Sequence, residues 1–150
     1  MNVLRIDSES SGAKDLVQQF VDGAGKSLSS FSYFEERSLD ILNNHIVTLL
    51  GYEGSGSVTN GALPIAYGHL DLDENGTVWL GVAVSEGFTG SGYGEKMVRA
   101  LIDCGEKTEE IKEIRLSVYK DNIPAQKLYE KLNFIKVLEN DKSFFYKLTL

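Results

Sequence analysis

The chain has 150 residues, 42% of them hydrophobic and 25% charged, which is the composition of one soluble globular domain covering residues 1–150. A formal net charge of −7 argues against unspecific binding to nucleic acid, which needs a basic surface, and suits cationic partners such as amines. No apolar run reaches the ~18 residues of a transmembrane helix, and a single cysteine, Cys104, excludes an internal disulfide.

The N-terminal residues MNVLRIDSES lack the basic segment and the following apolar stretch of a secretory signal. Together with the lone cysteine, this predicts a cytoplasmic protein. The expected partners are small molecules or peptides, with no nucleic acid and no membrane among them.

The first half of the chain predicts strands alternating with short helical segments. Apolar and β-branched residues mark the strands, and apolar residues at helical spacing mark the helices. The expected segments are a strand at 3–6, a helix at 14–21, a helix from Arg37, a strand at 46–52 and a Gly/Ser-rich hairpin loop at 53–61.

A β-hairpin is predicted in the middle of the chain. Residues 62–72 and 77–84 are apolar-rich runs, and the turn between them contains Asn75-Gly76, a strong hairpin signal. The second run, TVWLGVAV, is apolar on both faces, as in a central strand that is covered on both sides.

The second half predicts helices alternating with strands. Met97, Val98 and Leu101 repeat at helical spacing, and Cys104 continues their stripe as a predicted buried thiol. The expected segments are a helix at 92–107, a strand at 113–119, a helix at 122–132 and strands at 134–138 and 143–150. The whole pattern predicts an α/β (α+β) domain with a mixed sheet.

A turn with Gly87, Gly90, Gly92 and Gly94 joins the central strand to the long helix. Closely spaced glycines expose backbone N–H groups at a helix N-terminus, which is typical of a phosphate site. The dinucleotide fingerprint fails because residue 95 is Glu, and the nucleotide-triphosphate loop fails because Gly92 is followed by Tyr93. A glycine-rich turn without a ligand stays an alternative.

Two motifs carry a family resemblance. The segment Thr89-Gly-Ser-Gly-Tyr-Gly94 resembles the acetyl-CoA pyrophosphate motif Gln/Arg-x-x-Gly-x-Gly/Ala of the GNAT superfamily of N-acetyltransferases. Residues 122–134, NIPAQKLYEKLNF, resemble that family's second cofactor segment, Asn-x-x-Ala-x-x-Leu-Tyr-x-x-x-Gly-Phe. Two residues depart from the pattern: Thr89 replaces Gln or Arg, and Asn133 replaces Gly but also tolerates a left-handed backbone.

The resemblance implies the GNAT acyl-CoA N-acyltransferase fold, a mixed, mostly antiparallel sheet of six to seven strands flanked by about four helices. It implies transfer of an acetyl group from acetyl-CoA to a primary amine of a small molecule or peptide, by direct attack in a ternary complex. It also implies which residues bind acetyl-CoA: Val82, Ala83 and Val84 along the pantetheine arm, Thr89, Gly90, Ser91, Gly92, Tyr93, Gly94 and Glu95 around the pyrophosphate, and Asn122, Ala125 and Tyr129 on the next helix.

Tyr129 and Glu86 are the predicted catalytic residues. The resemblance implies that Tyr129 protonates the departing thiolate, although the same side chain also fits an apolar packing stripe. Glu86, just past the central strand, is the expected general base; His69, Asp71 and Asp73 are alternatives, and so is a chain of waters. No metal is expected, because His45 and His69 form no metal pattern with nearby acids in the sequence.

In the family, the acceptor site is built by the first two helices and the loop between the meander strands, here residues 31–45 and 53–61. Phe31, Tyr33 and Phe34 are a predicted aromatic wall, and Glu35, Glu36 and Asp40 are predicted to attract a cationic amine. Two other functions stay open: a non-catalytic acyl-CoA-binding or regulatory module, and a different phosphate binder. A homodimer is compatible with a sheet of this type.

Overall fold

The structure is a computed structural model that describes residues 1–10, 12–31, 33, 39–57 and 60–150. Its sheet has seven strands in the order β1-β2-β3-β4-β5-β7-β6, and every neighbouring pair is antiparallel except β4 and β5. The strands are β1 (Asn2–Ile6), β2 (His45–Tyr52), β3 (Ala66–Leu72), β4 (Val78–Val84), β5 (Glu113–Tyr119), β6 (Ile135–Glu139) and β7 (Ser143–Thr149). The predicted mixed sheet of six to seven strands is confirmed.

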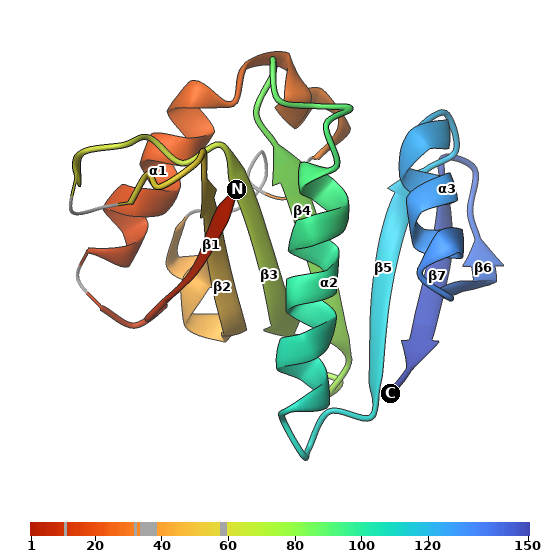
Figure 1. The fold of residues 1–150 in the computed structure, drawn as a ribbon. Coiled ribbons are helices and arrows are strands. Elements are labelled where there is room, and N and C mark those ends of the chain that lie inside the picture. The colour runs from red at the N-terminus through yellow and green to blue at the C-terminus, as the bar shows by residue number, and fades with distance from the viewer. Residues whose placement is uncertain (11, 32, 34–38, 58–59) are drawn as a thin grey trace.

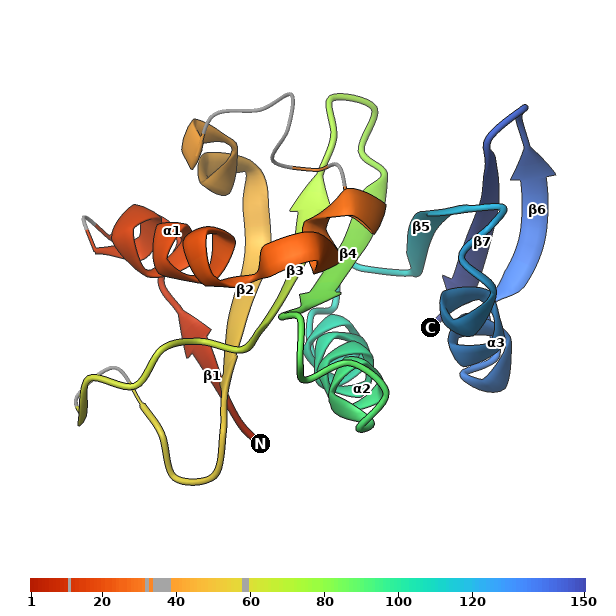
Figure 2. The ribbon, with the colours of Figure 1, turned by 90° about the horizontal axis from the view of Figure 1, so that it is seen from above.

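Helices cover both faces of the sheet. In Figure 2, α2 and α3 lie on one side and α1 with the following 3₁₀ turn lies on the other. The helices in the described part of the chain are α1 (Ala13–Gly23), α2 (Tyr93–Glu106) and α3 (Ile123–Lys131), with 3₁₀ turns η1 (Gly25–Ser30) and η3 (Leu39–Asn44). The predicted start of a second helix at Arg37 lies outside the described residues, and Leu39 and Leu42 belong to a 3₁₀ turn instead of an α-helix.

Two hydrophobic clusters hold these layers together. One packs Met97 and Leu101 of α2 over Gly68 of β3, where an added Cβ would lie 2.8 Å from Met97 Cγ and 2.9 Å from Leu101 Cδ1. The other packs Phe20 of α1 against Tyr67 on the opposite face, with ring centroids 5.7 Å apart. Cys104 is half-buried, so the prediction of a buried thiol is only partly right.

The sheet opens between β4 and β5. The two parallel strands are in register at Trp79 and Arg115, near their starts. Beyond this pair they move apart, and Figure 1 shows β4 and β5 diverging toward their carboxyl ends. Within the described part of the chain, no helix is long and apolar enough to cross a membrane.

Candidate active site

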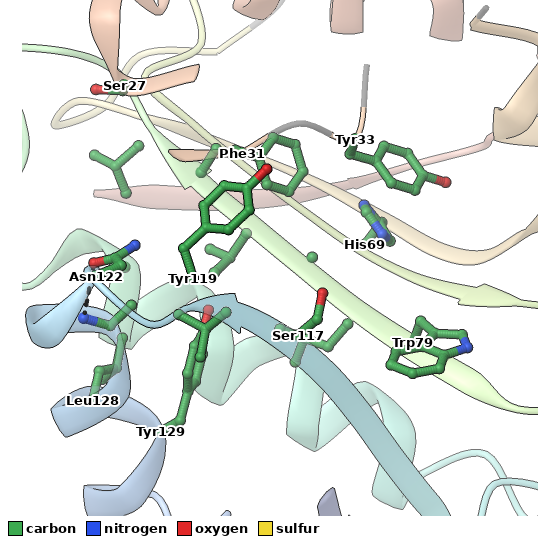
Figure 3. A pocket seen from close by; sticks show the side chains of 18 of the residues that line it. Ser27, Phe31, Tyr33, His69, Trp79, Ser117, Tyr119, Asn122, Leu128 and Tyr129 are labelled. Atoms are coloured by element: carbon green, nitrogen blue, oxygen red, sulfur yellow. Dashed lines mark hydrogen bonds between the residues drawn. The ribbon is translucent and has the colours of Figure 1, made fainter. Parts of the chain in front are cut away.

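A cleft of about 1370 Å³ lies where β4 and β5 separate. Residues from both strands, the glycine turn, η1 and α3 line it. Figure 3 shows side chains of β4, β5, η1 and α3 around it. The opening therefore brings together segments that are far apart in the sequence.

The edge of β4 that faces the cleft offers unpaired backbone groups. Ser85 N donates to Ile65 O at 2.8 Å, on the β3 side. Because successive amides of a strand point to opposite edges, the amides of Val84 and Val82 point away from β3 and toward the opening. An extended ligand can hydrogen-bond along this edge as an added strand would.

The glycine turn presents the N-terminus of α2 to the same cleft. Gly90 and Gly92 have φ values of 77° and 83°, in the left-handed region that favours glycine. Gly92 is the N-cap, and no side chain caps the helix there. Since the first amides of a helix have no partner within it, those of residues 93–95 are available to an anion.

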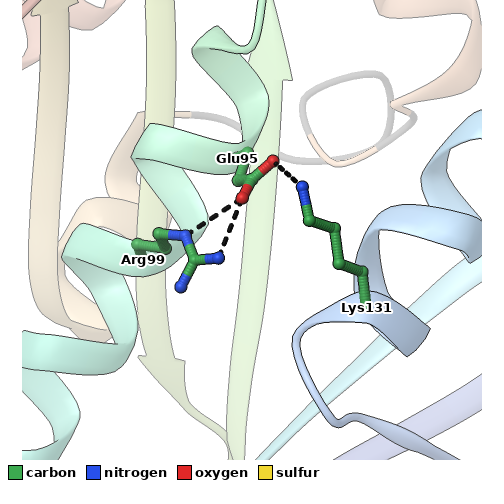
Figure 4. Close-up of polar contacts among 3 residues, drawn as sticks. All are labelled: Glu95, Arg99 and Lys131. Atoms are coloured by element: carbon green, nitrogen blue, oxygen red, sulfur yellow. Dashed lines mark hydrogen bonds and ion pairs between the residues drawn. The ribbon is translucent and has the colours of Figure 1, made fainter.

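Glu95 joins the start of α2 to α3. Its carboxylate accepts hydrogen bonds from Arg99 Nη2 and from Lys131 Nζ, both at 2.9 Å (Figure 4). The bond from Lys131, followed by that from Arg99, lowers the pKa of Glu95 below its ordinary value. Arg99 and Lys131 are thus held near the glycine turn, where both are paired with the Glu95 carboxylate.

Helix α3 forms the other wall. The side chain of Asn122 caps it by accepting a hydrogen bond from Ala125 N at 3.3 Å. Tyr129 follows two turns later, and its ring packs against Phe134 with centroids 5.8 Å apart. Tyr129 is 7% exposed and lines the cleft, and burial raises the pKa of its hydroxyl. The left-handed backbone predicted at Asn133, which ends the helix, is confirmed by its φ of 71°.

Aromatic and titratable side chains meet at the opposite end of the cleft. Tyr33 OH donates to Asp71 Oδ2 at 2.7 Å and lies 2.9 Å from His45 Nε2. The rings of Tyr33 and His69 have centroids 4.2 Å apart. This group lies on the α1 side of the sheet, so a molecule there would meet the end of a ligand that runs along β4.

Carboxylates accompany this group. Asp73 Oδ2 accepts a hydrogen bond from Trp79 Nε1 at 2.9 Å, and this bond contributes most to lowering the pKa of Asp73. Asp71, Asp73 and Glu74 all line the cleft. One end of the cleft therefore carries concentrated negative charge next to aromatic surfaces.

The cleft collects most of the predicted cofactor residues. All of them line it except Ser91 and Tyr93: Val82, Ala83, Val84, Thr89, Gly90, Gly92, Gly94, Glu95, Asn122, Ala125 and Tyr129. Lys96 and Arg99 are exposed on α2.

Glu86 does not line the cleft. Its Oε2 accepts a hydrogen bond from Lys26 N at 2.9 Å, and its side chain lies against Gly25. The carboxylate thus ties the end of β4 to η1, and the geometry does not favour it as a base.

The predicted acceptor segments contribute unequally. Phe31 and Tyr33 line the cleft, while Phe34, Glu35 and Glu36 lie outside the described residues. Asp40 forms an ion pair with Lys14, and none of the described residues of the 53–61 loop lines the cleft.

Sequence reasoning missed the contribution of β5. Ser117 and Tyr119 of this strand line the cleft, together with Phe145 of β7. Ser117 and Tyr119 flank the buried Val118, so the alternation of side chains along a strand places both on the opposite face of the sheet. Nothing in the sequence, however, shows that β5 borders an opening.

The sequence shows no metal pattern around His45 and His69, but the fold brings an acidic residue beside them. Donor atoms of His45, His69 and Asp71 lie within 4.8 Å of one another. The two imidazole rings, however, stack with centroids 4.6 Å apart and an interplanar angle of 22°. Since an imidazole binds a metal in its ring plane, stacked planes do not converge on one ion, and the arrangement is that of a hydrogen-bonded cluster.

Comparisons with known proteins agree with this geometry. The model of the acetyltransferase (GNAT) family matches residues 22–134. A spermine/spermidine N(1)-acetyltransferase of Bacillus subtilis (strain 168) is 31% identical over 113 residues, covering 72% of this chain and 74% of that protein.

Solved structures share the fold. A ribosomal-protein-alanine N-acetyltransferase from Brucella melitensis superposes with a TM-score of 0.73 at 14% identity, covering 100% of both chains. A putative acetyltransferase from Salmonella typhimurium, solved with its cofactor acetyl-CoA, superposes with a TM-score of 0.72 at 15% identity, covering 100% of this chain and 94% of that one.

Proposed function

Because the chain belongs to the acetyltransferase (GNAT) family, we propose that it transfers the acetyl group of acetyl-CoA to a primary amine by direct attack in a ternary complex. The observation that carries the proposal is the single cleft between β4 and β5. It joins the N-terminus of α2, the outer edge of β4, a buried tyrosine and an acidic, aromatic end. Each part suits one portion of the two substrates.

Acetyl-CoA would lie along the cleft from the glycine turn to the acidic end. The amides at the start of α2 would bind the pyrophosphate, and the outward amides of Val84 and Val82 would bind the pantetheine arm. The glycines at 90 and 92 favour this because their missing side chains leave the approach open: an added Cβ at either would find no heavy atom within 4 Å. Asn122 and Ala125 would border the arm from α3.

The chemistry needs a stabilised oxyanion and a proton for the leaving group. Attack by the amine nitrogen on the thioester carbon places negative charge on the carbonyl oxygen, and a fixed N–H on the β4 edge would stabilise it. When the C–S bond breaks, Tyr129 would donate its proton to the thiolate sulfur. A tyrosine hydroxyl keeps its proton at neutral pH, so the proton is available for this step.

The acidic end supports a cationic acceptor. Asp71, Asp73 and Glu74 would attract ammonium groups, and the neighbouring Trp79 would pack on the alkyl chain or the cation. The Bacillus subtilis relative is named for spermine and spermidine. We therefore propose a small polycationic amine as the acceptor class, with spermidine as the first compound to test.

Calorimetry followed by turnover tests this function. The purified chain is titrated with acetyl-CoA, ATP and NAD, and it is then assayed for thiol release with spermidine, an amino sugar and a peptide N-terminus. Binding of acetyl-CoA in preference to the nucleotides, with thiol release that depends on an amine, would support the proposal. Binding without turnover for any amine would favour a non-catalytic acyl-CoA-binding module, and equal binding of ATP would favour another phosphate binder.

A further inference from the structure

His69 is a buried basic group in the cleft that the chemistry above leaves without a role. It lies on β3, is 2% exposed, and lines the cleft. The hydroxyl of Tyr67 lies 2.7 Å from its Nδ1. The contact at Nδ1 holds the imidazole ring in one orientation and thereby sets the direction of Nε2.

The ring lies against the backbone of β4 because residue 81 is glycine. Gly81 pairs with His69 across the sheet, and an added Cβ there would lie 2.2 Å from His69 Cε1 and 2.7 Å from Nε2. Any side chain at this position would displace the imidazole. The Nε2 edge thus reaches β4 one residue before Val82, where the strand edge proposed to bind the acyl donor begins.

We propose that His69 is the general base of the reaction, accepting a proton from the acceptor amine at Nε2 while Tyr67 acts as a positioning residue at Nδ1. This deepens the proposed function and rests on it. The base role requires that Nδ1–H donates to the Tyr67 oxygen. A hydroxyl oxygen accepts from both the neutral and the protonated ring, so the bond persists through the proton transfer.

The ammonium group of the acceptor loses a proton to Nε2, and the free amine forms a C–N bond to the thioester carbon. The C–S bond then breaks, and the thiolate takes the Tyr129 proton. The remaining excess proton on the new amide nitrogen returns to the Tyr129 oxygen, and the His69 imidazolium releases its proton to solvent. The net products are the amide, CoA and one proton.

The surroundings of the ring favour this role. Asp71 follows two residues later on β3, and its negative charge stabilises an imidazolium. His45 of β2 stacks on the ring, but burial lowers its pKa to about 4, so it adds no positive charge near neutral pH. Among the described residues, Tyr33 and Tyr67 also contact the ring, and burial raises the pKa of Tyr67, which stays neutral.

His69→Ala tests the proposal directly. Its kcat with spermidine should fall by roughly 10²- to 10³-fold while the Kd for acetyl-CoA changes by less than about 2-fold, because general-base catalysis contributes this range. The acid limb of the wild-type pH profile should disappear. Added imidazole should restore part of kcat in a concentration-dependent way, which a merely structural role would not produce.

Two further variants sharpen the test. In Tyr67→Phe, kcat should fall roughly 10-fold, and the acid limb should move to lower pH because the imidazolium loses its Nδ1 acceptor. Glu86→Gln, in contrast, should keep the wild-type pH profile. A His69→Ala kcat within about 3-fold of wild type, an unchanged acid limb in Tyr67→Phe, or loss of that limb in Glu86→Gln would each overturn the proposal. A wild-type chain without amine-dependent thiol release would overturn the proposed function and the base with it.

Discussion

Tyr129 is the residue on which the proposed chemistry depends most. It reaches the cleft from α3, and its ring is fixed by Phe134 and by Tyr146, whose centroid lies 6.4 Å away. Because these contacts involve the ring and not the hydroxyl, removal of the hydroxyl leaves the packing intact. Packing and catalysis are therefore separable in one substitution.

Tyr129→Phe should lower kcat by about 100-fold with little change in the KM for acetyl-CoA, because only the proton donor for the thiolate is lost. Steady-state kinetics measures this, and thermal unfolding checks that the fold is kept. A kcat equal to that of wild type, in a folded variant, would contradict the assignment of Tyr129 as the acid.

His45 should make stability depend on pH. Burial lowers its folded-state pKa to about 4, below the ordinary value of 6.5. Between these values the unfolded chain binds a proton that the folded chain does not, so the free energy of unfolding falls as pH drops, by at most ~1.4 kcal/mol per pH unit. The contribution is fully present above pH 6.5.

Urea unfolding of wild type and His45→Gln at several pH values between 7.5 and 4.5 measures this effect. The variant should lose less free energy across that window than wild type. Carboxylates such as Glu95, whose lowered pKa acts at more acidic pH, are common to both proteins and cancel in the difference. Parallel curves for the two proteins would show that His45 is not buried in its neutral form.

The positions of some site residues could be predicted from the sequence, and those of others could not. Tyr129, Asn122 and the glycines at 90, 92 and 94 line the cleft, and the sequence could place them because their positions depend on neighbours within one helix and its preceding turn. Glu86 was misplaced because its partner, Lys26 N, lies 60 residues away in the sequence. The importance of Gly81 was invisible for the same reason: only the pairing of β3 with β4 puts it under His69.

Among the helices and strands, the N-terminus of α2 is the part on which the proposed binding of acetyl-CoA depends most. Gly92→Ala should weaken acetyl-CoA binding by roughly 10-fold, because an added methyl group strains the left-handed N-cap and narrows the approach to the helix amides. Calorimetric titration measures the affinity.

Gly61→Ala is the matched control. Gly61 also has a positive φ, 75°, and open space around it, but it lies in the loop before β3, outside the cleft. Both variants should lose about 1 kcal/mol of stability, and only Gly92→Ala should lose affinity. Equal losses of affinity would mean that the phosphate does not bind at this turn.

The contact of Glu95 with Arg99 and Lys131 predicts that removing the Glu95 charge increases the affinity for acetyl-CoA. Glu95→Gln removes a negative charge beside the proposed phosphate site and releases two cations, so acetyl-CoA should bind more tightly, and more so at low salt. Thermal stability should change little, because exposed ion pairs contribute little. Weaker binding in Glu95→Gln would show that the carboxylate positions the helix and does not oppose the ligand.

The sequence predicted most helices and strands to within a few residues, but it did not predict that β4 and β5 separate. The Asn75-Gly76 turn and the apolar run after it correctly predicted the β3–β4 hairpin, with β4 in the middle of the sheet. The divergence of β4 from β5 was not predicted, since no local pattern shows where two strands far apart in the sequence stop pairing.

At the scale of the whole molecule, part of the net charge of −7 is concentrated at the acidic end of the cleft, where Asp71, Asp73 and Glu74 lie. Asp73→Asn combined with Glu74→Gln should lower kcat/KM for spermidine several-fold and reduce its dependence on ionic strength. A neutral-chain primary amine should respond less to the same change. An equal response of both amines would show that these carboxylates do not select for charge.

The overall topology was within reach of the sequence because the two cofactor motifs resemble those of one family and fall on a strand–turn–helix and a capped helix. The acceptor end of the cleft could not be predicted from the sequence. It combines residues of β3, β4, β5 and the segment around Tyr33, which only the folded sheet brings together. The cytoplasmic location and the homodimer stay predictions.

The most direct test of the account is mass spectrometry of spermidine after incubation with the chain and acetyl-CoA. We predict one added acetyl group on a terminal primary amine, formed together with one equivalent of free CoA and not formed by Tyr129→Phe at a comparable rate. Unmodified spermidine and other amines, in the presence of a folded chain that binds acetyl-CoA, would contradict the proposal that this cleft catalyses acetyl transfer to an amine.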